Sequence, residues 1–135
     1  MASPCVYLDH NATAPVLAVA KTASSDALDL LGNPSSVHRF GAEARQVVDH
    51  ARDQVAELVG TKTGSVIFTS GGTEANNLAI LGTARPVIVS AAEHDSVLAP
   101  SRIAGRGLTI VPVDRDGVID LTVLNKALKA RPGAM

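Results

Sequence analysis

The sequence predicts an α/β fold in which a mainly parallel β-sheet is flanked by helices and preceded by an N-terminal arm and helices. From residue 65 onward, short apolar runs alternate with segments whose apolar residues recur every three or four positions, in the order β, α, β, α, β. The strand candidates are almost continuously apolar and the connections are short, which is typical of parallel strands covered by helices. With 135 residues, 46% of them hydrophobic, the chain is long enough to bury a core.

The composition indicates which kinds of partner and which cellular compartment to expect. The aromatic residues are two Phe and one Tyr, and the formal net charge is −1. We therefore expect an aliphatic, alanine-rich core and no nucleic-acid partner. No apolar run approaches the roughly 20 residues that cross a bilayer, so no membrane role is expected. Cys5 is the single cysteine, and residues 1–5 show no secretory signal pattern, so we expect a cytoplasmic protein.

The first part of the chain is predicted to form an arm and a helix. Residues 6–9 can form a short extended segment, and a polar turn over residues 10–15 follows it. Apolar residues at helical spacing predict a helix over residues 15–31, with Pro15 in its first turn and Gly32 at its end.

A loop over residues 32–41 is predicted to connect this helix to a second helix over residues 42–58. The loop is rich in turn-forming residues, so it can be an ordinary linker or part of a site. Arg45 and Asp49 are four positions apart on the second helix, and we expect an exposed ion pair between them. Such a pair contributes only about 0.3 kcal/mol, so it is assigned no chemistry.

The stretch from residue 65 to residue 80 is the centre of the predicted fold. Residues 65–70 are predicted to form a strand, Gly71 and Gly72 a tight turn, and Thr73 the N-cap of a helix that ends near Gly82. The free N–H groups and the dipole at the start of that helix can bind a phosphate. An ordinary strand-to-helix turn has the same residues, so the local pattern leaves both interpretations open.

Two further strands and two further helices complete the predicted sheet and the helices that cover it. Apolar runs predict strands over residues 87–90 and 108–113, with a helix over residues 96–104 between them. A turn at residues 114–117 follows, and Asp120 is expected to cap a last helix over residues 121–130.

His94 follows the strand over residues 87–90. Ligands of parallel sheets bind outside the carboxyl ends of the strands, so we expect His94 and the Gly71-Gly72 turn to share one edge. A neutral imidazole there can stack on a heteroaromatic ring whose phosphate lies at the helix start. A lone histidine after a strand is also commonly a surface or capping residue, and Glu93 can be a surface charge or an orienting partner.

Four segments resemble, in order and spacing, the N-terminal part of the cysteine desulfurases. These are aminotransferase class V proteins of pyridoxal-phosphate (PLP) fold type I, with selenocysteine lyase as a close relative. The segments are YLDHNATAP at 7–15, GNPSSVH at 32–38, FTSGGTEANN at 68–77 and EH at 93–94. The resemblance implies an incomplete domain over residues 1–135. Residues 1–41 would form an arm, a helix and an active-site loop, and residues 42–135 the start of the PLP-binding large domain.

The resemblance also implies roles for particular residues. Gly72 and Thr73 would bind the phosphate of pyridoxal 5'-phosphate, and His94 would stack on its pyridine ring. The residues implied to lie near the substrate entrance of a homodimer are Asn11, Ala12, Thr13, Asn33 and His38. His10 and Ala14 differ from the residues that are common in the family at these positions.

The activity implied is the conversion of L-cysteine to L-alanine with transfer of sulfur to an enzyme cysteine persulfide. The sulfur would serve iron-sulfur cluster or other cofactor assembly, with sulfur-acceptor or scaffold proteins as partners. The family's later aspartate, Ser-x-His-Lys segment and sulfur-accepting cysteine have no counterpart in this sequence. We therefore expect the chain alone to be inactive, with no catalytic residue of its own.

Four alternatives remain open. The chain can be a non-catalytic phosphate-binding α/β module, half of a split enzyme, part of a selenocysteine lyase, or a purely structural fragment with no ligand. Its lysines are expected on outer faces or in a turn, where they are unsuited to hold PLP covalently. They are Lys21, Lys62, Lys126 and Lys129.

Overall fold

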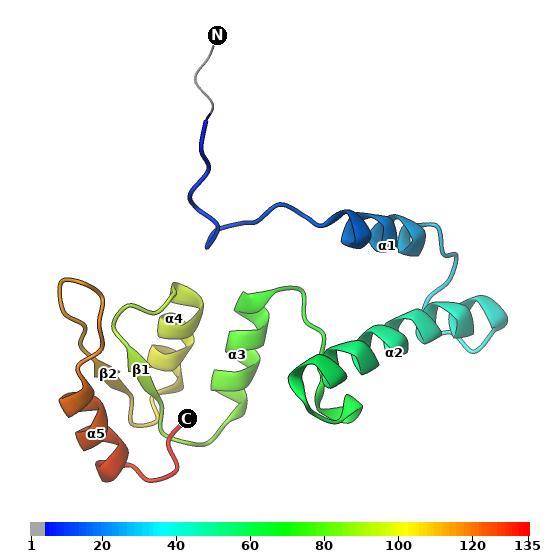
Figure 1. The fold of residues 1–135 in the computed structure, drawn as a ribbon. Helices are drawn as coiled ribbons and strands as arrows, with labels where there is room; N and C mark the ends of the chain where they lie inside the picture. Colours follow the sequence, from blue (N-terminus) through cyan, green and yellow to red (C-terminus); the bar gives the residue numbers. More distant parts are fainter. Residues whose placement is uncertain (1–4) are drawn as a thin grey trace. The chain divides into compact units, whose positions relative to one another are not determined.

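The computed structural model describes residues 5–135, and Figure 1 labels its helices and strands. Residues 1–4, in which the sequence shows no signal-peptide pattern, lie outside the described residues. The chain separates into two compact units, of which the first ends at Ile67 and the second spans Phe68–Met135. The boundary expected between residues 41 and 42 falls within a helix of the first unit.

The first unit contains the helices α1 (Ala18–Leu28) and α2 (Arg39–Val59) and the 3-10 helix η1 (Thr63–Ser65). The predicted first helix is confirmed at its centre, but α1 is shorter than residues 15–31 at both ends. No residue of α1 is buried, so no packing within the described part of this unit extends it. Residues 6–9 form no strand, because a strand requires a hydrogen-bonded neighbour and the described residues of this unit contain none.

The loop before α2 is packed against the first turn of that helix. Nδ1 of His38 accepts a hydrogen bond from the N–H of Gly41 at 3.3 Å, so His38 is the N-cap. The helix therefore begins at Arg39, three residues before its predicted start. Gly41 is buried, and a Cβ at this position would lie 2.8 Å from the carbonyl oxygen of Asn33.

Arg45 holds the same loop from the second turn of α2. Its Nε donates a hydrogen bond to the carbonyl oxygen of Pro34 at 2.8 Å. The predicted ion pair between Arg45 and Asp49 is therefore wrong. Asp49 instead accepts from Arg52 at 3.0 Å, because a folded-back loop carbonyl competes for the guanidinium of Arg45.

The second unit contains two strands and three helices. They are α3 (Gly72–Gly82), β1 (Ile88–Ser90), α4 (Asp95–Ala104), β2 (Thr109–Val111) and α5 (Leu121–Ala130). The strands β1 and β2 are parallel, with Val89 paired to Ile110, and α4 connects them. This confirms the predicted parallel sheet flanked by helices.

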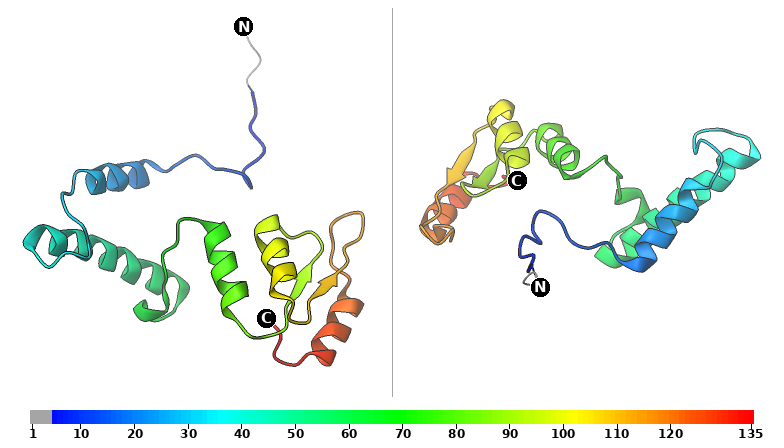
Figure 2. Two further views of the ribbon diagram at one scale, coloured as in Figure 1. Left: turned by 180° about the vertical axis from the view of Figure 1, so that it is seen from behind. Right: turned by 90° about the horizontal axis from the view of Figure 1, so that it is seen from above.

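The core of the second unit is aliphatic, as predicted. It consists of Ile80 from α3, Val87 just before β1, Val89 within β1, and Leu98 from α4. Figures 1 and 2 show α3 and α5 on opposite sides of the two strands, with α4 beside α3. The core therefore joins α3, β1 and α4 into one packed group.

The predicted strand over residues 65–70 is wrong. Ser65 ends η1, and residues 66–69 belong to no strand. Ile67 is 68% exposed, although a buried central strand would hide it. A β-branched run favours an extended backbone, but a strand forms only where a neighbour pairs with it. The two strands described in the second unit pair with each other instead.

The segment between β2 and α5 folds as predicted. Val113 and Ile119 form an antiparallel bridge around the turn at residues 114–117. Oδ1 of Asp120 accepts hydrogen bonds from the N–H groups of Thr122 and Val123, at 2.9 and 3.0 Å, and so caps α5. None of the helices in residues 5–135 combines the length and the hydrophobicity that a bilayer crossing requires.

Candidate functional site

The first turn of α3 has amide groups that no side chain caps. The N–H of Ala75 donates to the carbonyl oxygen of Gly71 at 3.1 Å, which makes Gly71 the N-cap and places Thr73 inside the helix. The prediction of Thr73 as N-cap is therefore wrong. Because Gly71 has no side chain, the first N–H groups of α3 remain available. A Cβ on Gly71 or Gly72 would meet nothing within 4 Å, so the space beside this turn is open.

Glu74 holds the loop that leads into α3. Its Oε2 accepts hydrogen bonds from the N–H of Ser70 at 2.7 Å and from the Ser70 hydroxyl at 2.6 Å. These two bonds, the hydroxyl bond first, lower the pKa of Glu74 below its ordinary value of 4.5. The carboxylate is thus committed to the loop, and the N–H groups of the first turn are left for another acceptor.

We expect Glu74 to make the stability of the second unit depend on pH. Because its pKa is lowered in the folded state, its stabilising effect is present above its unfolded pKa and is lost as the pH falls through the folded value. Hydrogen exchange between about pH 5 and pH 3 should show a steeper loss of protection in the wild type than in Glu74→Gln. Equal slopes would contradict this assignment. Glu93→Gln is the control, because the Glu93 side chain makes no hydrogen bond among the described residues.

His94 lies immediately before α4 and caps it. Its Nδ1 accepts a hydrogen bond from the N–H of Ser96 at 3.0 Å. The capping interpretation of His94 is therefore confirmed. The residue is also exposed, and a cap formed through Nδ1 leaves the ring face free to contact a flat ligand. Stacking on a ligand ring remains a prediction.

Two residues connect His94 to α3, and sequence reasoning missed both. Oγ of Ser96 lies 2.9 Å from Nδ1 of His94, and Nδ2 of Asn76 donates to that same Oγ at 2.9 Å. Asn76 lies on α3 one turn after Thr73, so the helix start and the imidazole are joined through two side chains. The spacing of two between His94 and Ser96 is a local capping signal. The contact with Asn76, 20 residues away, has no signal in the sequence.

The other predicted site residues belong to the first unit. Ala12 and Thr13 donate their N–H groups to the carbonyl oxygen of Asp9, at 3.1 and 3.4 Å, in the turn that contains Asn11. Oδ1 of Asn33 accepts from the N–H of Ser35 at 2.9 Å. These are local turn interactions, so the substrate-proximal roles remain predictions.

The lysines are placed on the surface, as the sequence predicts. All four lysines are exposed, and none has the desolvated surroundings that a reactive amine requires. Cys5 is a free, exposed thiol. Within residues 5–135, no group of three or more His, Cys, Asp or Glu side chains is arranged to bind a metal ion.

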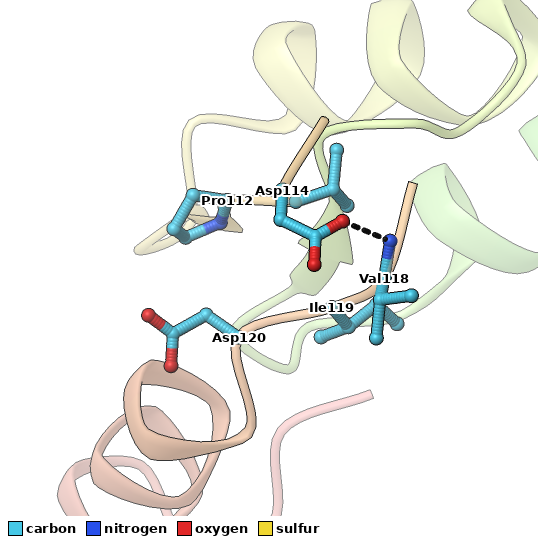
Figure 3. Close-up of a pocket in the computed structure, with 6 residues that line it drawn as sticks. Pro112, Asp114, Val118, Ile119 and Asp120 are labelled. Carbon is cyan, nitrogen blue, oxygen red and sulfur yellow. Dashed lines mark hydrogen bonds between the residues drawn. The ribbon is translucent and has the colours of Figure 1, made fainter. Parts of the chain in front are cut away.

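Three pockets are lined by residues other than those of α3 and His94. One pocket of about 340 Å³ is lined by residues 112–114 and 118–120, in the segment that connects β2 to α5. Figure 3 shows Asp114 in this pocket with its Oδ1 accepting from the N–H of Val118 at 2.9 Å. Another, of about 430 Å³, lies between the 32–38 loop and α2, beside Arg45. In the first of these pockets, Oδ1 of Asp114 is already occupied by the N–H groups of Asp116 and Val118.

Comparisons with known proteins agree with the motifs. The family described as aminotransferase class-V matches residues 6–135. The chain is 42% identical to the cysteine desulfurase IscS of Dictyoglomus turgidum, over 92% of this chain and 34% of that protein. It is 37% identical to the cysteine desulfurase IscS 1 of Archaeoglobus fulgidus, over 91% of this chain and 35% of that protein.

A solved structure gives the same result for the fold. The structure of a NifS-like protein superposes with a TM-score of 0.75 and 33% identity, covering 90% of this chain and 36% of that one. The chain therefore spans about a third of the length of the relatives that it matches.

Proposed function

Because the chain belongs to the aminotransferase class-V family, we propose that it is the N-terminal portion of a PLP-dependent cysteine desulfurase. The observation that carries the proposal is the connection of the uncapped start of α3 to His94 through Asn76 and Ser96. This connection supports one site in which a phosphate and an aromatic ring are bound together.

The residues present fit the cofactor. A phosphate dianion needs several donors and a positive potential, and the first turn of α3 offers free amide N–H groups together with the helix dipole. Gly71 and Gly72 leave the approach open. The Thr73 hydroxyl has no hydrogen-bond partner among the described residues, so it can donate to a phosphate oxygen. The carboxylate of Glu74 is occupied by Ser70 and does not cap the helix.

Each of these residues would bind or orient, and none would carry out the reaction. The start of α3 would hold the phosphate, and His94 would limit the position of the ring by contact with its face. PLP, when bound, supplies an electron sink for reactions of amino acids. Every lysine among the described residues is exposed, and the second unit contains no cysteine, so this portion alone would bind the cofactor without turning over a substrate.

The intact protein would act on L-cysteine and transfer its sulfur to a cysteine of the enzyme. In our proposal it is a cytoplasmic homodimer that delivers sulfur to acceptor or scaffold proteins for iron-sulfur cluster or other cofactor assembly. The Asn11 to Thr13 turn, Asn33 and His38 would lie near the substrate. The names of the relatives, cysteine desulfurase IscS, support this choice of activity.

We expect Thr73→Val to weaken PLP binding about tenfold, since a hydrogen bond to a charged group is worth about 1.5 kcal/mol or more. Equilibrium dialysis of the 135-residue chain against PLP measures this loss, and inorganic phosphate should compete. His94→Ala should also weaken PLP binding. Because His94 contacts the ring, its substitution should leave the affinity for inorganic phosphate unchanged.

Thr122→Val is the matched control for Thr73→Val. Thr122 is also the second residue of a helix, but the N–H groups of α5 are already capped by Asp120. No retention of PLP, or equal losses in both variants, would contradict the proposed site. Sequencing the gene beyond the codon for Met135 tests the activity: an open frame encoding Ser-x-His-Lys supports a desulfurase, and an immediate stop favours a non-catalytic module.

A further inference from the structure

We infer that Ser96 and Asn76 are positioning residues that hold the imidazole of His94 as its Nε2–H tautomer. The inference rests on the proposed function only for the identity of the ligand that the ring meets. The protonation of the ring follows from the hydrogen bonds of α3 and α4 alone.

The direction of the first bond is set by the backbone. The N–H of Ser96 lies 3.0 Å from Nδ1 of His94. An amide nitrogen can only donate, so Nδ1 accepts and carries no proton. In the neutral ring the proton must then be on Nε2.

The other bonds follow from this one. Oγ of Ser96 lies 2.9 Å from the same Nδ1, and because Nδ1 is an acceptor, the hydroxyl must donate its hydrogen. Oγ can then only accept from Asn76, which must present its NH₂ group and not its carbonyl oxygen. The observed 2.9 Å bond from Nδ2 of Asn76 has this direction. The bonds from Asn76 to Ser96 and from Ser96 to Nδ1 of His94 form a relay. This relay and the backbone N–H of Ser96 both favour an unprotonated Nδ1.

The relay is costly to break because its middle member is buried. Ser96 is 9% exposed and Asn76 is half-buried. A buried polar group without its partner is strongly disfavoured, so both side chains remain in these positions. The relay occupies Nδ1 and leaves the ring face and Nε2–H of the exposed His94 for a ligand. A ligand atom beside Nε2 must therefore be an acceptor, such as a carboxylate or phenolate oxygen.

The substitution Asn76→Asp tests the inference because it is isosteric and reverses the relay. A carboxylate only accepts, so the Ser96 hydroxyl would donate to residue 76 and its Oγ would accept from a protonated Nδ1, at the expense of the bond that Nδ1 accepts from the backbone N–H of Ser96. Long-range nitrogen NMR of the labelled 135-residue chain, at a pH about two units above the ordinary histidine pKa, reports the protonation of each ring nitrogen. His94→Gln assigns the signals.

We expect an unprotonated Nδ1 in the wild type and a shift of its signal toward a protonated nitrogen in Asn76→Asp. The matched control is Asn77→Asp, which adds the same charge one residue later in α3. Nδ2 of Asn77 donates to the carbonyl oxygen of Thr73 and not to Ser96, so Nδ1 should not change. His38 is an internal reference, because it caps α2 through a backbone N–H without a hydroxyl relay.

A protonated Nδ1 in the wild type, or equal spectra of Asn76→Asp and Asn77→Asp, would overturn the inference. If Asn76→Asp does not fold, Ser96→Ala replaces it. This variant keeps the backbone N–H of residue 96 as the single donor to Nδ1 and removes the hydroxyl donor, so a detectable Nδ1–H population, in which the backbone bond is broken, should appear. A ring spectrum identical to that of the wild type would then overturn the role of Ser96.

A second measurement separates this inference from the proposed function. With PLP added, Asn76→Asp should retain several-fold less cofactor than Asn77→Asp in equilibrium dialysis. If neither the wild type nor any variant retains PLP, the proposed function fails while the tautomer assignment stands. If PLP binds equally to both variants, the relay does not position His94 for this ligand, and the positioning role is overturned.

Discussion

Leu98→Ala is expected to lower the free energy of unfolding of the second unit by about 3 kcal/mol. Leu98 is 8% exposed and packs with Ile80, Val87 and Val89. Its removal leaves a cavity where α3, β1 and α4 meet, and the rigid sheet on one side limits how far the neighbours can close it. Hydrogen exchange of the β1 and α4 amides measures this loss.

Ile103→Ala is the matched control for Leu98→Ala. Ile103 also lies on α4 but is 76% exposed, so its truncation should change the free energy of unfolding by no more than about 0.5 kcal/mol. Equal effects of the two substitutions would show that α4 does not bury Leu98 against β1. Since α4 carries His94 at its start, Leu98→Ala should also weaken PLP retention indirectly.

Gly41→Ala is expected to destabilise the first unit by about 2 kcal/mol, although alanine favours helix more than glycine does. The added Cβ would overlap the carbonyl oxygen of Ser36 and lie 2.8 Å from that of Asn33. Both are backbone atoms, so no side-chain rotation relieves the overlap and the loop must move. We expect faster exchange of the Ser36 N–H, which donates to the Asn33 carbonyl oxygen at 2.9 Å.

Gly64→Ala is the control that separates the effect of this overlap on stability from the general effect of replacing a glycine with alanine. Gly64 lies in η1 of the same unit, and a Cβ there would meet nothing within 4 Å. We expect a neutral or slightly stabilising change of at most about 1 kcal/mol. If Gly41→Ala were equally harmless, the packing of the loop over residues 32–38 against α2 would be disproved.

Local patterns in the sequence were sufficient to predict most helices and strands of the second unit. The predicted helix to Gly82 ends there, and the strand predicted over residues 87–90 contains β1. The turn after β2 and the cap by Asp120 are confirmed. Each of these depends on neighbours within a few positions, such as apolar residues at one spacing or a carboxylate next to free N–H groups.

Predictions failed where the outcome depends on a distant partner or on the path of the backbone. The run over residues 65–70 has strand propensity but no strand pairs with it, and Arg45 binds the carbonyl oxygen of Pro34 in preference to Asp49. Thr73 has a suitable capping side chain, but the backbone places Gly71 at the N-cap. The pairing of strands and the partner of Arg45 depend on segments that a local window does not contain.

The sequence by itself determined the family and the aliphatic core and pointed to the residues proposed to bind a phosphate and a ring, because motifs and periodicity are properties of neighbouring residues. Only the tertiary structure decided that Asn76 and His94 are joined through Ser96. Hydrogen bonds depend on distance and direction in space. The packing of α3 against α4 brings together side chains that lie far apart along the chain, and this packing sets which nitrogen of His94 faces a ligand.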